Sequence, residues 1–172
     1  VLLVGATLLL RSVMHLRHKD IGFDPRGMYA LEPRLPSERY ATAASKAAFA
    51  AALDARIREL PGVEAITYAS APPTSTSYLI GALQREGAPA PPAGTTGLIA
   101  VNAVASNYFQ FMGIRIIEGT GFTDTTNAAG QVIVNEGMAK SLWPGESPVG
   151  RKLRVVYDAN SPWHTVVGVA GN

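Results

Sequence analysis

The sequence predicts an α+β fold. Short apolar or alternating segments typical of strands outnumber the helical segments, and they do not follow the strict strand–helix–strand order of a parallel sheet. The chain has 172 residues, of which 47% are hydrophobic and 16% charged, so it can bury a core and is too apolar to be disordered. One compact domain and two small subdomains both fit this composition.

The first ten residues, Val1 to Leu10, carry no charge and are typical of the end of a membrane helix. Ten helical residues cover about half of a hydrocarbon core about 30 Å thick, so this run alone cannot span a bilayer. Basic residues follow the run instead of preceding it, which disfavours a secretory signal peptide. Since the chain opens on Val1 instead of Met, we expect a transmembrane helix that begins further upstream; the alternative is an apolar helix of a soluble core.

Basic residues cluster directly after this apolar run, at Arg11, His15, Arg17, His18 and Lys19. Clustered bases beside an apolar helix are typical of contacts with lipid phosphates. The sequence has no basic stripe interleaved with aromatic residues, so it does not predict nucleic-acid binding. Basic residues that flank a membrane helix favour the cytoplasmic side of the membrane. Both flanks of the helix are needed to decide its orientation. The chain has no cysteine, which excludes disulfides, thiolate metal sites and thiol catalysis.

The clearest helix is predicted over residues 41–60. Thr42 is its expected N-cap, and Pro61 with Gly62 ends it. Its apolar residues recur every three or four positions, at Phe49, Leu53, Ile57 and Leu60. Two shorter helices are expected over residues 107–112, with Ser106 as the cap, and over residues 136–143.

Strands are predicted wherever apolar or alternating segments lie between Gly, Pro and Asn-rich turns. They are expected over residues 63–70, 78–86, 98–104, 114–118, 131–135, 151–157 and 163–169. The run GAPAPPAGTTG, residues 87–97, cannot hold regular structure and predicts an exposed connection. The last two strands are expected to form a hairpin.

Motifs for phosphate, dinucleotide or metal binding are weak. Gly150-Arg151-Lys152 lacks the glycine-rich loop of a phosphate-binding motif and predicts a turn into a strand. Gly119-Thr120-Gly121 lacks the third glycine of a dinucleotide fingerprint, so a backbone bend is favoured. His15 and His18, with Asp20 nearby, lack a firm third ligand, so interfacial cations are favoured over a metal site.

Asp158, Ser161 and His164 are the one group of Asp, Ser and His close together in the sequence. A serine hydrolase needs a strained nucleophile turn and an oxyanion hole, and Ser161 lies before a proline without a G-x-S-x-G motif. Turn residues and a surface histidine explain all three positions. No catalytic, cofactor-binding or metal-ligating residue is therefore expected.

Five stretches together resemble the MacB-like periplasmic core domain of ABC transporter permeases of the FtsX-like superfamily. They are LLVGATLLLRSVMHLRHKDIGFDP, LPGVEA, SNYFQFMGIRIIEGTGFT, VIVNEGMAKSLWPGESPVGRKLRV and WHTVVGVAGN. The chain is most similar to the second periplasmic domain of large permeases with two such domains. The resemblance covers essentially the whole chain and depends on the order and spacing of the motifs.

The resemblance implies three parts. Residues 1–19 would be the end of a transmembrane helix and a stalk, residues 20–97 a porter-like α+β subdomain, and residues 98–172 a second α+β subdomain. It also implies a location in the cell (inner) membrane, with residues 20–172 in the periplasm.

The resemblance also implies what the domain does. The domain would relay conformational change and contact a periplasmic adaptor or an exported substrate, without catalysis and without a cofactor. A cytoplasmic ATP-binding subunit or domain, the lipid membrane and a second permease half or copy would be its partners, and nucleic acid would not. The alternatives are a membrane-anchored sensor or ligand-binding domain and a tethered hydrolase that uses Ser161 and His164.

The residues of the resembling motifs are expected to act as scaffold. A bulky anchor at Trp143 followed by a forced turn ends a helix, and Asn135 begins it as the cap. Tyr108 and Phe109 are expected to belong to an apolar turn that Gly113 ends. The complete set is Asn135, Trp143, Pro144, Gly145, Pro148 and Gly150, with Tyr108, Phe109 and Gly113.

Overall fold

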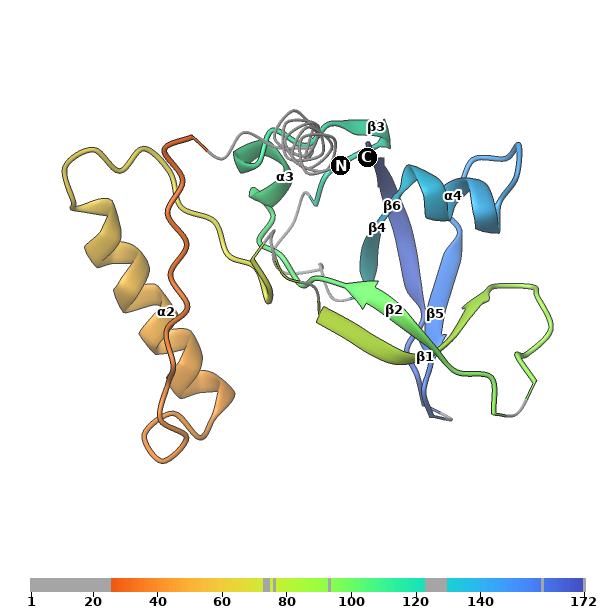
Figure 1. Cartoon of the computed structure of the whole chain (residues 1–172), viewed down its shortest axis with the longest axis horizontal. Coiled ribbons are helices and arrows are strands. Elements are labelled where there is room, and N and C mark those ends of the chain that lie inside the picture. Colours follow the sequence, from red (N-terminus) through yellow and green to blue (C-terminus); the bar gives the residue numbers. More distant parts are fainter. Residues whose placement is uncertain are drawn as a thin grey trace, which may run out of the picture.

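The structure, a computed structural model, describes residues 26–72, 75, 77–92, 94–122, 130–158 and 160–171. The predicted membrane helix end and stalk, residues 1–19, lie outside these ranges. Within the described ranges, no helix is both long enough and apolar enough to cross a bilayer. Figure 1 shows helix α2 on one side of the molecule and a β-sheet with helix α4 on the other.

Helix α2 spans Ala43–Arg58 and begins as the sequence predicts. Thr42 accepts a hydrogen bond from the Ser45 amide, and the Ser45 side chain accepts one from the Thr42 amide, so the two residues form a reciprocal capping box. None of the helix residues is buried. Its aromatic side chain Phe49 packs edge-on against Tyr40 from the preceding segment, with ring centroids 5.2 Å apart.

The strand predicted over residues 63–70 is wrong. Residues 63–68 form no regular structure, and only Ala69 pairs, in an isolated antiparallel bridge with Val104. A strand is defined by its pairing, and a local alternation of side chains does not supply a neighbour. In the described part of the chain, Tyr68 instead reaches back to α2, where its hydroxyl donates to Asp54 at 3.0 Å.

Within the described ranges, six strands form one sheet in the order β2-β1-β5-β6-β3, with β4 also paired to β6. The β4–β6 pair is parallel and all the other pairs are antiparallel. This mixed sheet with few helices confirms the predicted α+β class. The strands span Ser77–Arg85 (β1), Gly97–Val101 (β2), Ile116–Gly119 (β3), Gln131–Asn135 (β4), Lys152–Val156 (β5) and His164–Ala170 (β6).

Strand β1 changes partner along its length. Its first half pairs with β2 and its second half pairs with β5, and Gly81 marks the change. A Cβ atom at Gly81 would lie 2.6 Å from the carbonyl oxygen of Val156, so only glycine fits there. Strand β1 lies before residue 97, the subdomain boundary that the resemblance implies, and the other strands of the sheet begin at or after it. Both parts of the chain therefore contribute to one sheet.

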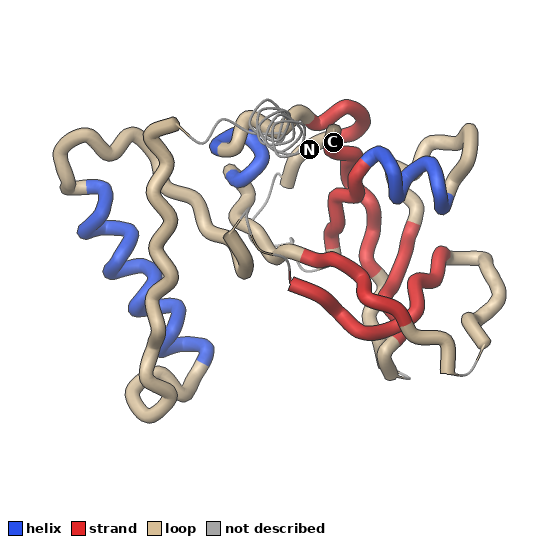
Figure 2. The backbone as a smooth tube through the Cα atoms, in the orientation of Figure 1, coloured by secondary structure: helices blue, strands red, loops and turns tan. Residues whose placement is uncertain are grey.

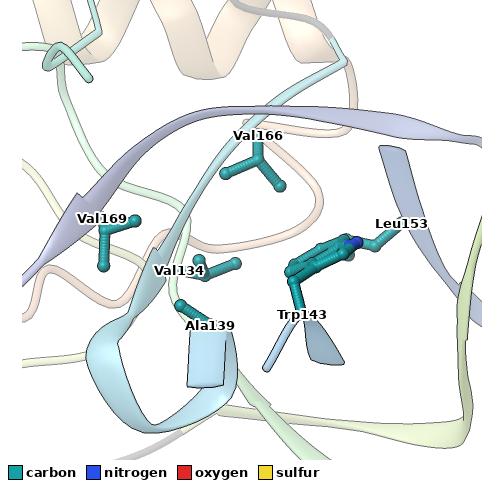
Figure 3. Packing of buried hydrophobic residues seen from close by; sticks show 6 residues of the cluster. All are labelled: Val134, Ala139, Trp143, Leu153, Val166 and Val169. Atoms are coloured by element: carbon teal, nitrogen blue, oxygen red, sulfur yellow. The ribbon is translucent and has the colours of Figure 1, made fainter. Parts of the chain in front are cut away.

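The core lies between the sheet and α4, which spans Glu136–Leu142. Figure 3 shows the Trp143 ring beside Leu153, with Val166 and Val169 from β6 in the same cluster. Val166 has no exposed surface and Trp143 is 3% exposed. Val134 and Ala139 complete the cluster, so residues from β4, α4, β5 and β6 share it.

Helix α3 spans Tyr108–Phe111, and its cap differs from the prediction. Asn107 instead of Ser106 occupies the N-cap position, and it makes no side-chain capping bond. Tyr108 and Met112 are buried, and Gly113 ends the turn with a φ of 68°.

Candidate functional site

Helix α4 follows β4 without a loop, so its first turn depends on its cap. The Asn135 side chain accepts a hydrogen bond from the Met138 amide at 2.8 Å, which is the capping contact that the sequence predicts. Lys140 and Glu136 form an exposed ion pair one turn apart, at 2.7 Å. The helix is thereby fixed at its start by β4.

The turn after α4 folds back onto the sheet. Trp143 leaves the helical conformation, its amide still donates to Ala139, and its carbonyl accepts from the Glu146 amide at 3.1 Å. Gly145 has a φ of 75°, which favours glycine. The other motif residues close the return: Pro144 lines the turn, Pro148 is buried, and the Gly150 amide donates to the Val166 carbonyl at 2.8 Å.

Charged side chains on this turn contact one another and strand β3. Arg151 forms an ion pair with Glu146, and its Nε donates to the Ser147 carbonyl at 2.9 Å. The Ser147 hydroxyl donates to Glu118. These side chains are exposed, so the contacts position the turn more than they stabilise the fold. Arg151 and Lys152 thus belong to a turn and a strand start, as the sequence predicts for Gly150-Arg151-Lys152.

The polar atoms of Ser161 are committed to its own turn. The buried hydroxyl accepts from the Tyr157 and Asp158 amides at 3.0 Å each and donates to the Asp158 carbonyl or carboxylate. His164 lies opposite Leu153 in the β5–β6 pair, and no contact joins it to Ser161 among the described residues. Asp158, Ser161 and His164 are therefore near in sequence without forming a triad.

Gly119 and Gly168 let β3 and β6 approach closely. Gly119 has a φ of 74°, and a Cβ there would lie 2.3 Å from the Val167 carbonyl oxygen. A Cβ at Gly168 would lie 2.3 Å from the Thr120 carbonyl oxygen. Gly119 is the last residue of β3, and the Thr120 amide that follows it donates to the Val167 carbonyl at 2.9 Å. His15, His18 and Asp20 lie outside the described residues, and no cluster of three metal-ligating side chains occurs within them.

The aromatic side chains near α3 pack in a row. Tyr108 meets Phe109 edge-on at 5.8 Å, and Phe109 meets Phe122 at 6.0 Å between ring centroids. Burial raises the pKa of the Tyr108 hydroxyl, so it stays neutral in the physiological range. This row anchors α3 against the end of the β3 segment.

One hollow that the sequence does not predict lies between β1 and the end of α4. Its volume is about 330 Å³, and most of its wall comes from residues 83–85, 141, 142 and 144. The Arg85 guanidinium donates to the Leu142 carbonyl at 3.1 Å, and the Gln84 side-chain amide donates to the Ala88 carbonyl at 3.2 Å. Both of these polar side chains thus have protein partners.

Comparison with known proteins places this fold in a family. A family model for the MacB-like periplasmic core domain matches residues 4–172. The chain therefore belongs to the MacB-like periplasmic core domain family, whose members are the periplasmic domains of MacB/FtsX-like ABC transporter permeases. No protein with a curated description matches the chain.

Three solved structures are similar to parts of this chain. The periplasmic region of MacB from Actinobacillus actinomycetemcomitans is 17% identical over 70% of this chain and 50% of its own, with a TM-score of 0.49. A domain of a putative permease from Porphyromonas gingivalis is 18% identical over 69% of this chain and 48% of its own, also at 0.49. The extracellular domain of the noncanonic ABC-type transporter YknZ from Gram-positive bacteria is 16% identical over 69% and 55%, at 0.47. The chain spans about half the length of each.

Proposed function

We propose that this chain is the extracytoplasmic domain of an ABC transporter permease and that it relays conformational change between the membrane and a periplasmic partner or exported substrate. The family match over residues 4–172 carries this proposal. Among the described residues, the Ser161 hydroxyl is committed to the Tyr157 and Asp158 backbone of its own turn, which fits a non-catalytic role. ATP hydrolysis would belong to a cytoplasmic ATP-binding subunit or domain.

Residues 1–19 would attach the domain to the membrane as the end of a transmembrane helix and its stalk. The apolar run Val1 to Leu10 and the basic cluster that follows support this arrangement. The periplasmic location of residues 20–172 follows from the family by analogy. A pseudo-dimer of permease halves, or a homo-oligomer, would place two such domains side by side.

The arrangement of the elements supports a relay of two units. We define the helix unit as residues 26–65, with α2, and the sheet unit as residues 77–101 and 108–171, with the six strands, α3 and α4. Figure 2 shows α2 apart from the strands, with loop segments between them. This division keeps β1 and β2 in one unit, earlier in the chain than the boundary at residue 97 that the resemblance implies.

Exposed apolar side chains on the helix unit support a protein contact there. Tyr29 is 95% exposed, Leu31 76% and Leu60 55%, although large apolar side chains are usually covered. A partner that covers them would receive the motion of the helix unit. The motif residues Asn135, Trp143 and Gly150 would then serve as scaffold of the sheet unit.

The test is a distance measurement in the full-length protein with its ATP-binding subunit. Spin labels at Ala55→Cys on α2 and Lys140→Cys on α4 report how the two units lie, both positions being exposed. The relay predicts that ATP, added to an ATPase-blocking variant, shifts the distance from each of these labels to a label in the partner half. A sensor or ligand-binding domain predicts no response to nucleotide, and that result would overturn the proposal.

A further inference from the structure

Two chain segments run antiparallel between the helix unit and the sheet unit, and we call them the ribbon: residues 66–71 and 102–107. Backbone hydrogen bonds join them at two places, from the Ser70 amide to the Ala103 carbonyl at 2.8 Å and from the Ala105 amide to the Tyr68 carbonyl at 2.9 Å. The Ala69–Val104 bridge lies between. The ribbon extends the β1–β2 pair toward α3 and α2 (Figure 1).

The Asn102 side chain takes the place of backbone hydrogen bonds where the pairing of the two ribbon segments ends. Pro72 has no N–H to continue the pairing. The Asn102 Oδ1 accepts from the Ala71 amide at 3.1 Å and from the Ser70 hydroxyl at 2.8 Å, and its Nδ2 donates to the Ala71 carbonyl at 3.1 Å. A side-chain amide thus satisfies both backbone groups of the buried Ala71.

Asn107 makes a second crossing contact and gives up its capping role to do so. At an N-cap position its oxygen would ordinarily accept from an amide of the first helical turn. Its Nδ2 instead donates to the Ile66 carbonyl at 2.8 Å, and its Oδ1 accepts from the Thr67 hydroxyl at 2.9 Å. The ribbon is therefore attached to the start of α3, whose Tyr108 is buried.

The contacts continue from the ribbon into α2 and into β2. Tyr68 donates its hydroxyl to Asp54 on α2, and Val101, which directly precedes Asn102, pairs with Ser77 of β1. One exposed hydrogen bond competes with water and has a small net effect. Five bonds from two asparagine side chains act on one short segment, however, and a bend of the ribbon would break them together.

We propose that the ribbon is a rigid coupler and that Asn102 and Asn107 are the positioning residues that hold the helix unit at a fixed orientation to the sheet unit. This inference rests on the proposed function: a relay needs a stiff connection between its two parts, and the ribbon would supply it. A flexible linker would absorb the motion of either unit.

Spin-label distances without nucleotide test the coupler in the full-length protein. Labels at Ala55→Cys and Lys140→Cys are unique within this chain, which has no cysteine, once cysteines elsewhere in the protein are replaced by serine. The parent protein should give one narrow distance distribution. The Asn102→Ala/Asn107→Ala variant should broaden this distribution and speed exchange of the Ala71 amide about tenfold, because the bond from that amide to Asn102 is lost.

Asn160→Ala is the matched control, since its side chain lies in the β5–β6 turn and takes no part in the ribbon. This variant should leave the width of the distance distribution and the amide exchange of the ribbon unchanged. Exchange in β6 shows whether the sheet unit is intact; if the double variant loses that protection, Asn102→Asp, which keeps the oxygen and loses the amide donor, is measured instead. A broad distribution in the parent, or an unchanged one in a variant with β6 intact, overturns the coupler. Nucleotide is absent throughout, so failure of the ATP response would leave this result standing.

Discussion

Trp143 is the largest side chain of the buried core cluster. It is 3% exposed, and the cluster in Figure 3 joins it with residues of β4, β5 and β6. We expect Trp143→Ala to lower the free energy of unfolding by about 3–5 kcal/mol, because a cavity replaces the indole. Thermal and denaturant unfolding of the sheet unit measure this loss.

Trp163→Ala is the control for that change. Trp163 is 38% exposed, and its ring lies under the Arg154 guanidinium at 4.6 Å. The same truncation there removes less buried surface and should cost clearly less. Equal losses for the two tryptophans would contradict the placement of Trp143 in the core.

Asp54 reports the contact between α2 and the ribbon. Its pKa lies below the usual value, first because Arg58 donates to its carboxylate and further because Tyr68 donates to it. Because the pKa is lower in the folded state, the ionised carboxylate stabilises the fold at pH values above 3.8, the pKa of the unfolded state. This stabilisation is lost as the pH falls through the pKa of the folded state. The contact should therefore be insensitive to pH between about 5 and 8.

Two substitutions should raise the pKa of Asp54 by different amounts. Arg58→Gln removes the larger cause and should raise it more than Tyr68→Phe does. Arg56→Gln, on the same helical turn without a contact to Asp54, should leave it unchanged. Carboxyl chemical shifts followed through an acid titration measure all three, and a larger effect of Tyr68→Phe would show that the guanidinium is misplaced.

At the scale of elements, glycines set where the strands of the sheet cross. Gly168 lies where β6 passes the carbonyl of Thr120, and Gly81 lies where β1 passes Val156. We expect Gly168→Ala and Gly81→Ala each to destabilise the sheet unit by about 1–3 kcal/mol, because a methyl group would overlap a backbone oxygen. The denaturant midpoint measures this.

Gly137, in α4, is a glycine at which we expect alanine to stabilise the protein instead of destabilising it. Its Cβ position is open, with the nearest atom at 3.8 Å, and its φ is not in the left-handed region. Gly137→Ala should therefore stabilise the protein by about 0.4–1 kcal/mol through helix propensity and the unfolded chain. A destabilised Gly137→Ala, or a neutral Gly168→Ala, would contradict the described backbone.

Local signals made most elements predictable. The Thr42 and Asn135 caps locate the starts of α2 and α4, and the apolar segment 131–135 coincides with β4. Residues 63–70 could not be predicted correctly, because pairing depends on neighbours that local alternation does not reveal. Asn102 and Asn107 have no local signal either, since their partners lie 31 to 41 positions away.

At the scale of the whole molecule, the α+β class and the family were predictable because motifs extend along the entire chain. The pairing of strand β1 with β5 was not predictable, because the two strands lie about 70 residues apart in the sequence. The described structure joins a helix unit with little buried surface to a sheet unit with a compact core. A rigid connection between them would let the motion of one unit pass to the other.

The nucleotide dependence of the distances from the Ala55 and Lys140 labels to the partner half, in the full-length protein with its ATP-binding subunit, tests the central claim most directly. The relay predicts that ATP shifts both distances, while the Ala55–Lys140 distance within the domain keeps its mean and its narrow width. Distances that are the same with and without ATP would contradict the claim that this domain relays conformational change.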